Sequence, residues 1–207
     1  MFKENSAIIL DFLPTGYASG FKKEPVAQAI GEDFLTLLEL TPKPNVSFSL
    51  REKVYIGKDE RDKVQFIKGR ITFDKLTATA RNELEAYVKD RVQEQEAKYV
   101  EFFNKAGPIT VRQHSLELLP NIGKKHMWDI INARDKKPFE SFKDIEQRVA
   151  LMPDPRKVVI ERMMDEFKGG EKYYLFIRPP APKTEQHEGR FGGSRPFQNR
   201  DRGFRRR

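Results

Sequence analysis

The stretch Leu-Glu-Leu-Leu-Pro-Asn-Ile-Gly-Lys-Lys-His-Met-Trp-Asp-Ile-Ile, residues 116–131, decides the fold of the C-terminal half of this chain. An apolar segment ends at Pro120, and a short turn, residues 121–123, leads to a second apolar segment that Lys124 and Lys125 open. The first amides of a helix have no partner inside the helix, and the helix dipole adds partial positive charge there. The stretch therefore predicts an anion-binding site at the start of the second segment.

Residues 108–178 are expected to form four helices. Thr110 and Gln113 have capping-box spacing, so the first helix should begin near Val111 and end before Pro120. The second helix is expected from about Gly123 to Ala133, the third after a Ser141 cap, and the fourth from about Pro155 to Gly169. A short strand is expected after them, at Tyr173–Ile177.

The turn between the first two helices must reverse the chain within a few residues. Such a reversal needs a positive φ, which Gly123 tolerates best and Asn121 to a lesser extent. Ile122 can fill the space between the helices, and the amides of Gly123, Lys124 and Lys125 would then point outward. An ordinary helix corner with solvated lysines is the alternative, and the basic chain favours phosphate binding over it.

A second, looser copy of this pattern follows at residues 151–157. Pro155 stands where the first copy has an amide donor, whereas Arg156 and Lys157 keep the positive charge. The loss of a donor favours a structural role for this copy over a phosphate-binding one.

The N-terminal part, residues 5–75, has the short apolar runs of a β-rich domain. Runs of this kind at close spacing favour a small barrel, and we expect an oligonucleotide-binding (OB)-like β-barrel in a chain of the α+β class. The expected strands are Ala7–Leu13, Phe34–Leu40, Val46–Leu50, Val54–Ile56 and Val64–Ile71, with a single helical turn at Val26–Ile30.

Two further segments complete the chain. Residues 76–107 have helical periodicity among many charged residues, which predicts one long connecting helix that ends at Gly107-Pro108. Residues 179–207 are rich in Arg and Gly and have no apolar periodicity, which predicts a disordered basic tail. Its eight Lys and Arg residues exceed its three Asp and Glu residues by 8 − 3 = 5, out of a net charge of +8 for the whole chain.

Aromatic and basic residues alternate in the predicted barrel. We expect Tyr55 and Phe66 to stack on bases and Lys58, Lys68 and Arg70 to contact phosphates. The alternative is that the aromatic side chains belong to the barrel core, because alternation exposes only one face of a strand. In the tail, Arg and Gly mixtures of this kind bind RNA loosely, and the arginines that we select as contacts are Arg190, Arg202 and Arg205.

The composition excludes several functions. The chain has no Cys, so it can form neither disulfides nor thiolate metal sites. It has no membrane-length apolar run, so we expect a soluble, cytoplasmic protein. Neither a phosphate-binding Gly-Lys-Ser/Thr loop nor a dinucleotide pattern is present, and the three His residues lack ligand spacing, so we expect no cofactor, metal or catalysis.

The residues at 119–123, Leu-Pro-Asn-Ile-Gly, resemble the helix-hairpin-helix signature, with Asn121 where a Gly is usual. Together with residues 8–16, 24–31, 34–40 and 139–145, they make the chain similar to an archaeal family known as domain of unknown function 655. The resemblance implies an OB-like barrel joined to a helix-hairpin-helix domain over about residues 5–178. It also implies phosphate-backbone binding without sequence specificity, and a monovalent cation on the carbonyls of residues 119–123.

These features together predict a non-enzymatic protein that binds nucleic acid, RNA in preference to DNA. The hairpin would grip phosphates, while the barrel and the tail add contacts. Two alternatives stay open. The first is an adaptor that docks onto a ribosomal or transcription protein, and the second is a DNA-binding protein of the repair type, for which Asp154, after the hairpin, is the one catalytic candidate.

Overall fold

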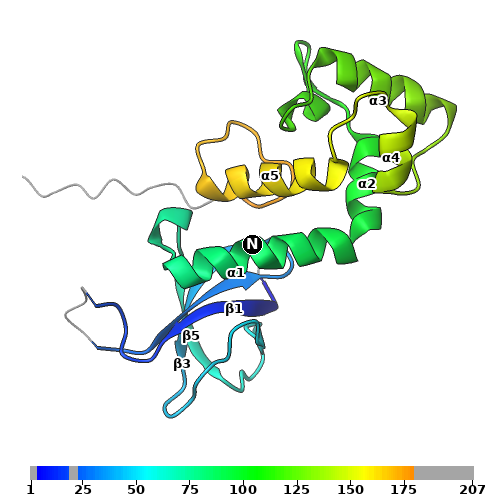
Figure 1. Cartoon of the computed structure of the whole chain (residues 1–207). Helices are drawn as coiled ribbons and strands as arrows, with labels where there is room; N and C mark the ends of the chain where they lie inside the picture. Colours follow the sequence, from blue (N-terminus) through cyan, green and yellow to red (C-terminus); the bar gives the residue numbers. More distant parts are fainter. Residues whose placement is uncertain (1–3, 19–22, 180–207) are drawn as a thin grey trace, which may run out of the picture.

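The computed structural model describes residues 4–18 and 23–179, which form an α+β fold (Figure 1). A curled five-stranded antiparallel sheet forms the N-terminal part, and five α-helices within the described residues follow it. The predicted class is confirmed. The sheet closes only halfway towards a barrel, because its two outer strands do not pair with each other.

The sheet has the strand order β4-β1-β2-β3-β5, and every neighbouring pair is antiparallel. Its strands are β1 (Ser6–Leu13), β2 (Val26–Gly31), β3 (Leu37–Pro42), β4 (Lys53–Tyr55) and β5 (Val64–Arg70). Alternate residues of β1 enter different cores, since Ala7 and Ile9 lie inside the curl while Ile8 and Leu10 face the helices. Both faces of β1 are therefore buried over residues 7–10.

Two predictions for this region were wrong. Residues 26–30 form the central strand β2 and not a helical turn. The strand is buried throughout and is rich in Ala, so it lacks the alternation that marks a strand with one exposed face. Residues 46–50 form no strand, because positive φ angles at Asn45 and Arg51 turn the chain at both ends of this segment.

The predicted single connecting helix is two helices, α1 (Ala78–Glu94) and α2 (Glu96–Lys105). The break falls at Gln95, whose φ of −108° and ψ of 34° leave the helical region. Helix α1 lies across the sheet, and α2 runs away from it at a steep angle (Figure 1). The break thus redirects the chain from the sheet to the helical part.

Helix α1 is a packing layer between the sheet and the rest of the protein. Its buried face includes Leu84, Val88 and Val92, and it contacts β1 on one side and α5 on the other. The side chain of Gln28, fully buried in β2, accepts a hydrogen bond from the amide of Thr77, the N-cap of α1. This bond positions the start of α1 on the sheet.

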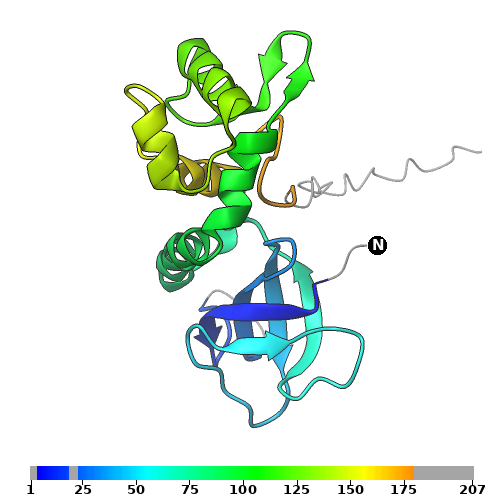
Figure 2. The ribbon, with the colours of Figure 1, turned by 90° about the vertical axis from the view of Figure 1, so that its right-hand side faces the viewer.

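The helical part begins with a small β-hairpin where a helix was predicted. Its elements are β6 (Pro108–Thr110), β7 (Gln113–His114), the 3₁₀ helix η2 (Ser115–Leu118), α3 (Lys124–Lys136), α4 (Phe142–Arg148) and α5 (Pro155–Lys168). The hairpin rises at the same end of the molecule as α3 (Figure 2). The helices that begin after Gly123, Ser141 and Asp154 agree with the predictions.

The first helix of this part was placed wrongly because its capping signal belongs to other residues. The amide of His114 donates to the carboxylate of Glu117, and the His114 ring accepts from the amide of Leu116. Thr110 and Gln113 instead face each other across the two-residue turn of the β6–β7 hairpin. Only four residues remain for helix before the turn, and they adopt the 3₁₀ form.

The segment after α5, residues 171–179, crosses back to the sheet, and we call it the C-terminal strap. Glu166, fully buried in α5, accepts the amides of Leu175, Phe176 and Ile177 and pairs with Arg162 at 3.0 Å. The strap forms no strand, contrary to the prediction for residues 173–177, because these amides bind a side chain and not a neighbouring strand.

One apolar core joins the sheet to the helical part. It includes Leu37 of β3, Val88 of α1, Phe103 of α2, Ile130 of α3 and Met163 of α5. The strap extends this core, because Ile177 is buried in it and the amide of Arg178, next to it, donates to the carbonyl of Phe34. The two parts are therefore one packed body.

Candidate nucleic-acid interface

The turn before α3 has the geometry of a type II reversal. The amide of Ile122 donates to the carbonyl of Leu119 at 3.2 Å, and Pro120 and Asn121 are the two residues between them. Asn121 has a φ of 60°, so the positive φ is at this residue. Ile122 is buried in the core, as its predicted filling role requires. The carbonyl of Leu119, one of those suggested for a cation, thus already accepts a hydrogen bond.

Gly123 does not have the positive φ that we expected of it. Its φ of −91° and ψ of −178° are extended backbone that any residue can adopt. A Cβ added at this position would meet no atom within 4 Å. The fold therefore does not require glycine here, and the residue leaves the space in front of the helix empty.

The N-terminus of α3 is open to solvent and basic. Gly123 is its N-cap and has no side chain to bind the first amides. Lys124 and Lys125 are exposed in the first turn, and the first turn holds no acidic residue. Trp128, 57% exposed, lies three residues beyond Lys125 on the same outer face. Exposed backbone donors, two cations and an aromatic ring thus share one surface, and the sequence reasoning overlooked the ring.

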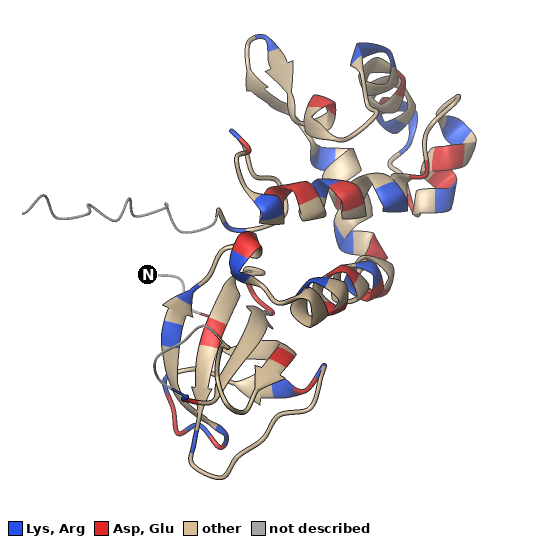
Figure 3. Cartoon of the chain, turned by 60° about the vertical axis from the view of Figure 1, so that its left-hand side comes forward, with Lys and Arg blue, Asp and Glu red and all other residues tan. Residues whose placement is uncertain are grey.

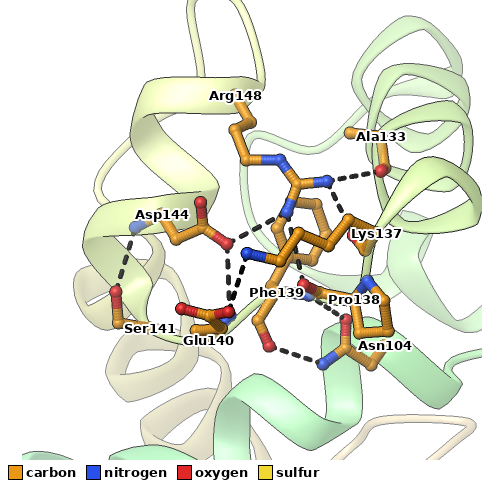
Figure 4. Close-up of polar contacts among 9 residues, drawn as sticks. All are labelled: Asn104, Ala133, Lys137, Pro138, Phe139, Glu140, Ser141, Asp144 and Arg148. Carbon is orange, nitrogen blue, oxygen red and sulfur yellow. Dashed lines mark hydrogen bonds and ion pairs between the residues drawn. The ribbon is translucent and has the colours of Figure 1, made fainter.

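Helix α3 is held in place at its C-terminal end by Arg148 of α4 (Figure 4). The guanidinium donates to the carbonyls of Ala133 and Lys137, both at 2.6 Å, and pairs with Asp144 at 3.0 Å. It also lies over the ring of Phe139 at 4.7 Å. Cationic groups at the C-terminus of a helix satisfy its last carbonyls, so this cluster is a cap that fixes α3 against α4.

The second turn repeats the backbone geometry of the first. The amide of Met152 donates to the carbonyl of Val149 at 3.3 Å, and Leu151 has a φ of 58°. Leu151 thus corresponds to Asn121, with one more residue before the following helix than in the first turn. The His126 ring lies 3.1 Å from the Leu151 carbonyl oxygen, so α3 contacts the second turn directly.

The second turn differs from the first at its helix N-terminus. The carboxylate of Asp154, the N-cap of α5, accepts the amides of Arg156 at 3.0 Å and Lys157 at 3.3 Å. The Arg156 guanidinium is part-buried over the Phe142 ring at 6.0 Å, while Lys157 is exposed. A negative charge already occupies this N-terminus, which supports the structural role predicted for it.

A groove of about 590 Å³ separates the outer strands of the sheet, and we call it the β4–β5 groove. Its lining brings together three of the predicted contact residues, Tyr55, Lys58 and Arg70. The sequence reasoning overlooked its other members, among them Arg61, Leu38 and Ile67. Tyr55 is 38% exposed, so it lies at the surface and not in the core.

Two of the predicted sheet residues do not line this groove. Phe66, 45% exposed, lies opposite Thr41 of β3. Lys68 forms an ion pair of 3.1 Å with Glu39, so a carboxylate already balances its charge. The prediction grouped these residues with Arg70 because aromatic and basic residues are interleaved in this segment, but the register of β3 and β5 shifts at two places, so the residues do not all share one face.

Other candidates for chemistry are engaged in structure. Asp154, which the sequence suggested for catalysis, uses its carboxylate as a helix cap. Burial, followed by the nearby charge of Arg134, lowers the pKa of His114, while Glu117 opposes this effect. Among residues 4–18 and 23–179, no group of three or more His, Asp or Glu side chains is placed to hold a metal ion.

The charge of the described part is mixed. Basic and acidic residues alternate along α1 and α5 (Figure 3). The tail arginines selected from the sequence, Arg190, Arg202 and Arg205, lie outside the described residues. No helix in the described part of the chain has both the length and the apolar character needed to cross a bilayer.

The fold and these sites define an α+β protein with two candidate anion-binding surfaces, one on a helix N-terminus and one between strand edges. The chain belongs to the family described as "Protein of unknown function (DUF655)", whose model matches residues 3–178. An uncharacterised protein of Methanocaldococcus jannaschii is 46% identical over 177 residues, which are 84% of this chain and 80% of the relative.

A crystal structure from the same family, that of Af1531 from Archaeoglobus fulgidus, has a similar fold. Its TM-score is 0.74 at 43% sequence identity, and the match covers 84% of this chain and all of the other. The family match ends at residue 178, just before the basic tail.

Proposed function

We propose that this protein binds nucleic acid, RNA in preference to DNA, by gripping backbone phosphates at the N-terminus of α3. In this proposal the two turns form a paired helix-hairpin-helix unit in which η2 replaces the first helix. The curled sheet acts as an open OB-like barrel, and the basic tail raises the affinity and the association rate.

The observation that carries the proposal is the difference between the two helix N-termini. Two adjacent turns have the same reversed backbone, yet only the one before α3 leaves its amides without a side-chain cap. That end also has two exposed lysines and the exposed ring of Trp128. Free amides with nearby cations are what a phosphate oxygen binds. Contacts of this kind read no bases, so we expect little sequence specificity.

The preference for RNA has a separate basis. Single-stranded and irregular RNA exposes bases that can stack on aromatic side chains, and Tyr55 and Trp128 are both exposed. Regular double-stranded DNA hides its bases within the stack, and it would therefore use only the phosphate contacts.

The experiment is a titration of the full chain with a labelled RNA hairpin and with DNA of the same sequence, followed by fluorescence anisotropy over a series of salt concentrations. The logarithm of the affinity should fall linearly with the logarithm of the salt concentration, by about 0.7–0.9 for each phosphate contacted. A response that does not change with salt would rule out the phosphate mechanism.

A pair of matched variants locates the contact. Lys125→Gln should reduce the salt slope by about one unit, because it removes one phosphate contact. Lys157→Gln removes the same charge from the first turn of α5 and should leave the slope nearly unchanged, since Asp154 occupies that N-terminus. Equal effects of the two variants would mean that α3 is not the binding element.

One observation favours a second candidate function, docking onto a protein. Val111, Leu151 and Trp128 are large apolar residues that are 106%, 85% and 57% exposed, and all three belong to the helical part. Aromatic and aliphatic side chains of this kind anchor protein interfaces. The adaptor function would be favoured if Trp128→Ala abolished co-purification of a single polypeptide while affinity for RNA stayed as in the parent.

A further inference from the structure

The β4–β5 groove has no assigned ligand, and its chemistry is specific. We propose that it holds one unpaired nucleotide, with the base against the ring of Tyr55 and the phosphate near Lys58, Arg61 and Arg70. The proposal rests on the proposed function and names the element of the nucleic acid that the sheet selects.

The size and the lining of the groove suit a flat ring with polar edges. Its volume of about 590 Å³ lies within the range of roughly 300–1,000 Å³ that small-molecule sites occupy. Leu38 and Ile67 give it an apolar part, and Thr36, whose buried hydroxyl has no hydrogen-bond partner in the described chain, adds a polar one. β4 and β5 are the outer strands of the sheet, so each also has one edge whose backbone groups no strand pairs with.

The cations of the groove differ from others on the sheet. Arg61 donates to the carbonyl of Gly57 and Arg70 to the carbonyl of Pro179, and within the described residues neither they nor Lys58 form an ion pair. Four other cations of the sheet region are paired with carboxylates, namely Arg51, Lys53, Lys63 and Lys68. The two carboxylates of the groove, Glu4 and Asp59, bind backbone amides and the Tyr55 hydroxyl instead, so the cations without an ion pair gather where Tyr55 is exposed.

Tyr55 is held in position before any ligand arrives. Its hydroxyl donates to the carboxylate of Asp59 at 2.9 Å. The ring lies directly over Gly57, where a Cβ would come within 2.2 Å of the Tyr55 hydroxyl oxygen. The glycine thus makes room for the ring, and the aspartate fixes its direction. A ring held in this way loses little conformational entropy when a base stacks on it.

The positive charge of the groove also indicates which ligand it would accept. The tail of this chain begins next to the groove at Pro179, but residues 180–207 carry a net charge of +5 and would be repelled by the unpaired cations. An anionic polymer would instead be attracted by both the basic tail and the cations of the groove. A nucleotide can contact both kinds of group in the groove, because its base stacks on an aromatic ring and its phosphate binds cations. A peptide that adds to a strand edge binds through backbone hydrogen bonds and would make no use of the Tyr55 ring.

The test uses the full chain and three probes, which are a labelled single-stranded oligouridylate, a blunt RNA duplex, and uridine monophosphate as competitor. Tyr55→Leu should weaken binding of the oligouridylate about tenfold, whereas Tyr55→Phe, which keeps the ring, should stay within about threefold of the parent. Binding of the blunt duplex should not change in either variant. Equal affinity of the Leu and Phe variants for the oligouridylate would overturn the proposal.

A charge-matched pair on one strand keeps the proposal testable if Tyr55→Leu does not fold. Arg70→Gln should weaken oligouridylate binding about tenfold. Lys68→Gln, two residues away and outside the groove, should change it less than about twofold. Equal losses would mean that only net charge matters, which would overturn the groove as a site.

The three probes also separate the possible sources of failure. A protein that binds the duplex but not the oligouridylate would refute the groove and leave the phosphate grip of α3 intact, whereas a protein that binds neither would refute the proposed function itself. Competition by uridine monophosphate that Tyr55→Leu abolishes would identify a free nucleotide as a sufficient ligand. Lack of competition, with Tyr55-dependent binding of the oligouridylate, would identify a nucleotide within a strand.

Discussion

Gly123 and Asp154 are the N-caps of two helices that follow turns of the same backbone geometry, yet only Asp154 fills its helix N-terminus with a side chain. The carboxylate of Asp154 binds the amides of Arg156 and Lys157, whereas no side chain caps the corresponding amides of α3, where Lys124 and Lys125 are exposed. One N-terminus is thus closed by the protein itself, and the other is open to a ligand.

Gly123→Asp should copy the closed N-terminus into the open one. Asp is a better N-cap than Gly by a few tenths of a kcal/mol, and its charge interacts favourably with the helix dipole, so the free energy of unfolding should rise slightly. Binding of RNA should weaken by about tenfold or more, because the carboxylate takes the amides and repels phosphate. Denaturant unfolding and fluorescence anisotropy measure the two effects.

Gly123→Asn is the control for this prediction, because it caps the amides without adding charge. We expect it to weaken RNA binding less than Gly123→Asp does. If Gly123→Asp bound RNA as tightly as the parent while remaining folded, the amides of α3 would not be the contact.

Asn121 should be replaceable by Gly but not by Val. Gly adopts a φ of 60° freely, so Asn121→Gly should leave the melting temperature unchanged or raise it. Asn121→Val forces a β-branched residue into the left-handed region and should cost about 1–3 kcal/mol of unfolding free energy. Thermal unfolding followed by circular dichroism would show the difference, and equal stability of the two variants would contradict the turn geometry.

The stability of the turn region should depend on pH through His114. Its pKa is lowered in the folded protein, first by burial, so below about pH 6.5 the unfolded state takes up the proton more readily than the folded state. The contribution of His114 to the free energy of unfolding is therefore complete above the pKa of the unfolded state, and it is lost as the pH falls through the lower pKa of the folded state. The loss should be smaller in His114→Asn, which keeps a capping side chain. Urea unfolding at about pH 7.5 and about pH 5 measures it, and identical losses in the two proteins would contradict it.

Glu166 should be among the most sensitive positions in the protein. Glu166→Gln removes the carboxylate charge that pairs with the guanidinium of Arg162, which is only 5% exposed. Because Glu171 still pairs with Arg162 at 2.8 Å, the variant should cost about 1.5–3 kcal/mol. The variant should also release the C-terminal strap, because the same carboxylate accepts three strap amides. Faster hydrogen exchange at Leu175, Phe176 and Ile177 would reveal this. Lys168→Gln, on the same helix but exposed, is the control and should change stability by less than about 0.5 kcal/mol.

Removal of residues 180–207 should weaken RNA binding and make it less sensitive to salt. The deletion removes eight cations and three acidic residues, so fewer counterions are released on binding. The melting temperature should stay the same, because Arg178 and Pro179, which end the described strap, are retained. A truncated protein that binds with the same salt slope as the parent would exclude the tail from the interface.

Much of the fold follows from local patterns in the sequence. The strands at residues 6–13 and 64–70 and the helices after Ser141 and Asp154 were predicted because alternation, caps and a first-turn proline mark them. Central strand β2 was missed because burial on both faces removes alternation. The break at Gln95 was missed as well, since no proline or glycine marks it.

The residues of the candidate sites were also predicted only in part from the sequence. Tyr55, Lys58 and Arg70, selected for the mixture of aromatic and basic residues, line one groove, but Lys68, selected for the same reason, is paired with Glu39 of a neighbouring strand. Arg61 was missed because it lies in the loop between β4 and β5, outside both strands, although it closely follows Lys58. Pairing across strands and the curvature of a sheet are tertiary properties, so the local pattern could not separate free cations from neutralised ones.

The unbroken core between the sheet and the helical part has a consequence for recognition. Leu37, Phe103 and Ile130 belong to one packed body, so the open end of α3 and the β4–β5 groove keep a constant separation and orientation. The protein would then hold its two candidate binding surfaces at one fixed distance. If both proposals hold, a nucleic acid would contact both surfaces only when the distance between its gripped phosphate and its unpaired nucleotide matches the fixed distance between them, so the protein would select by length and not by sequence.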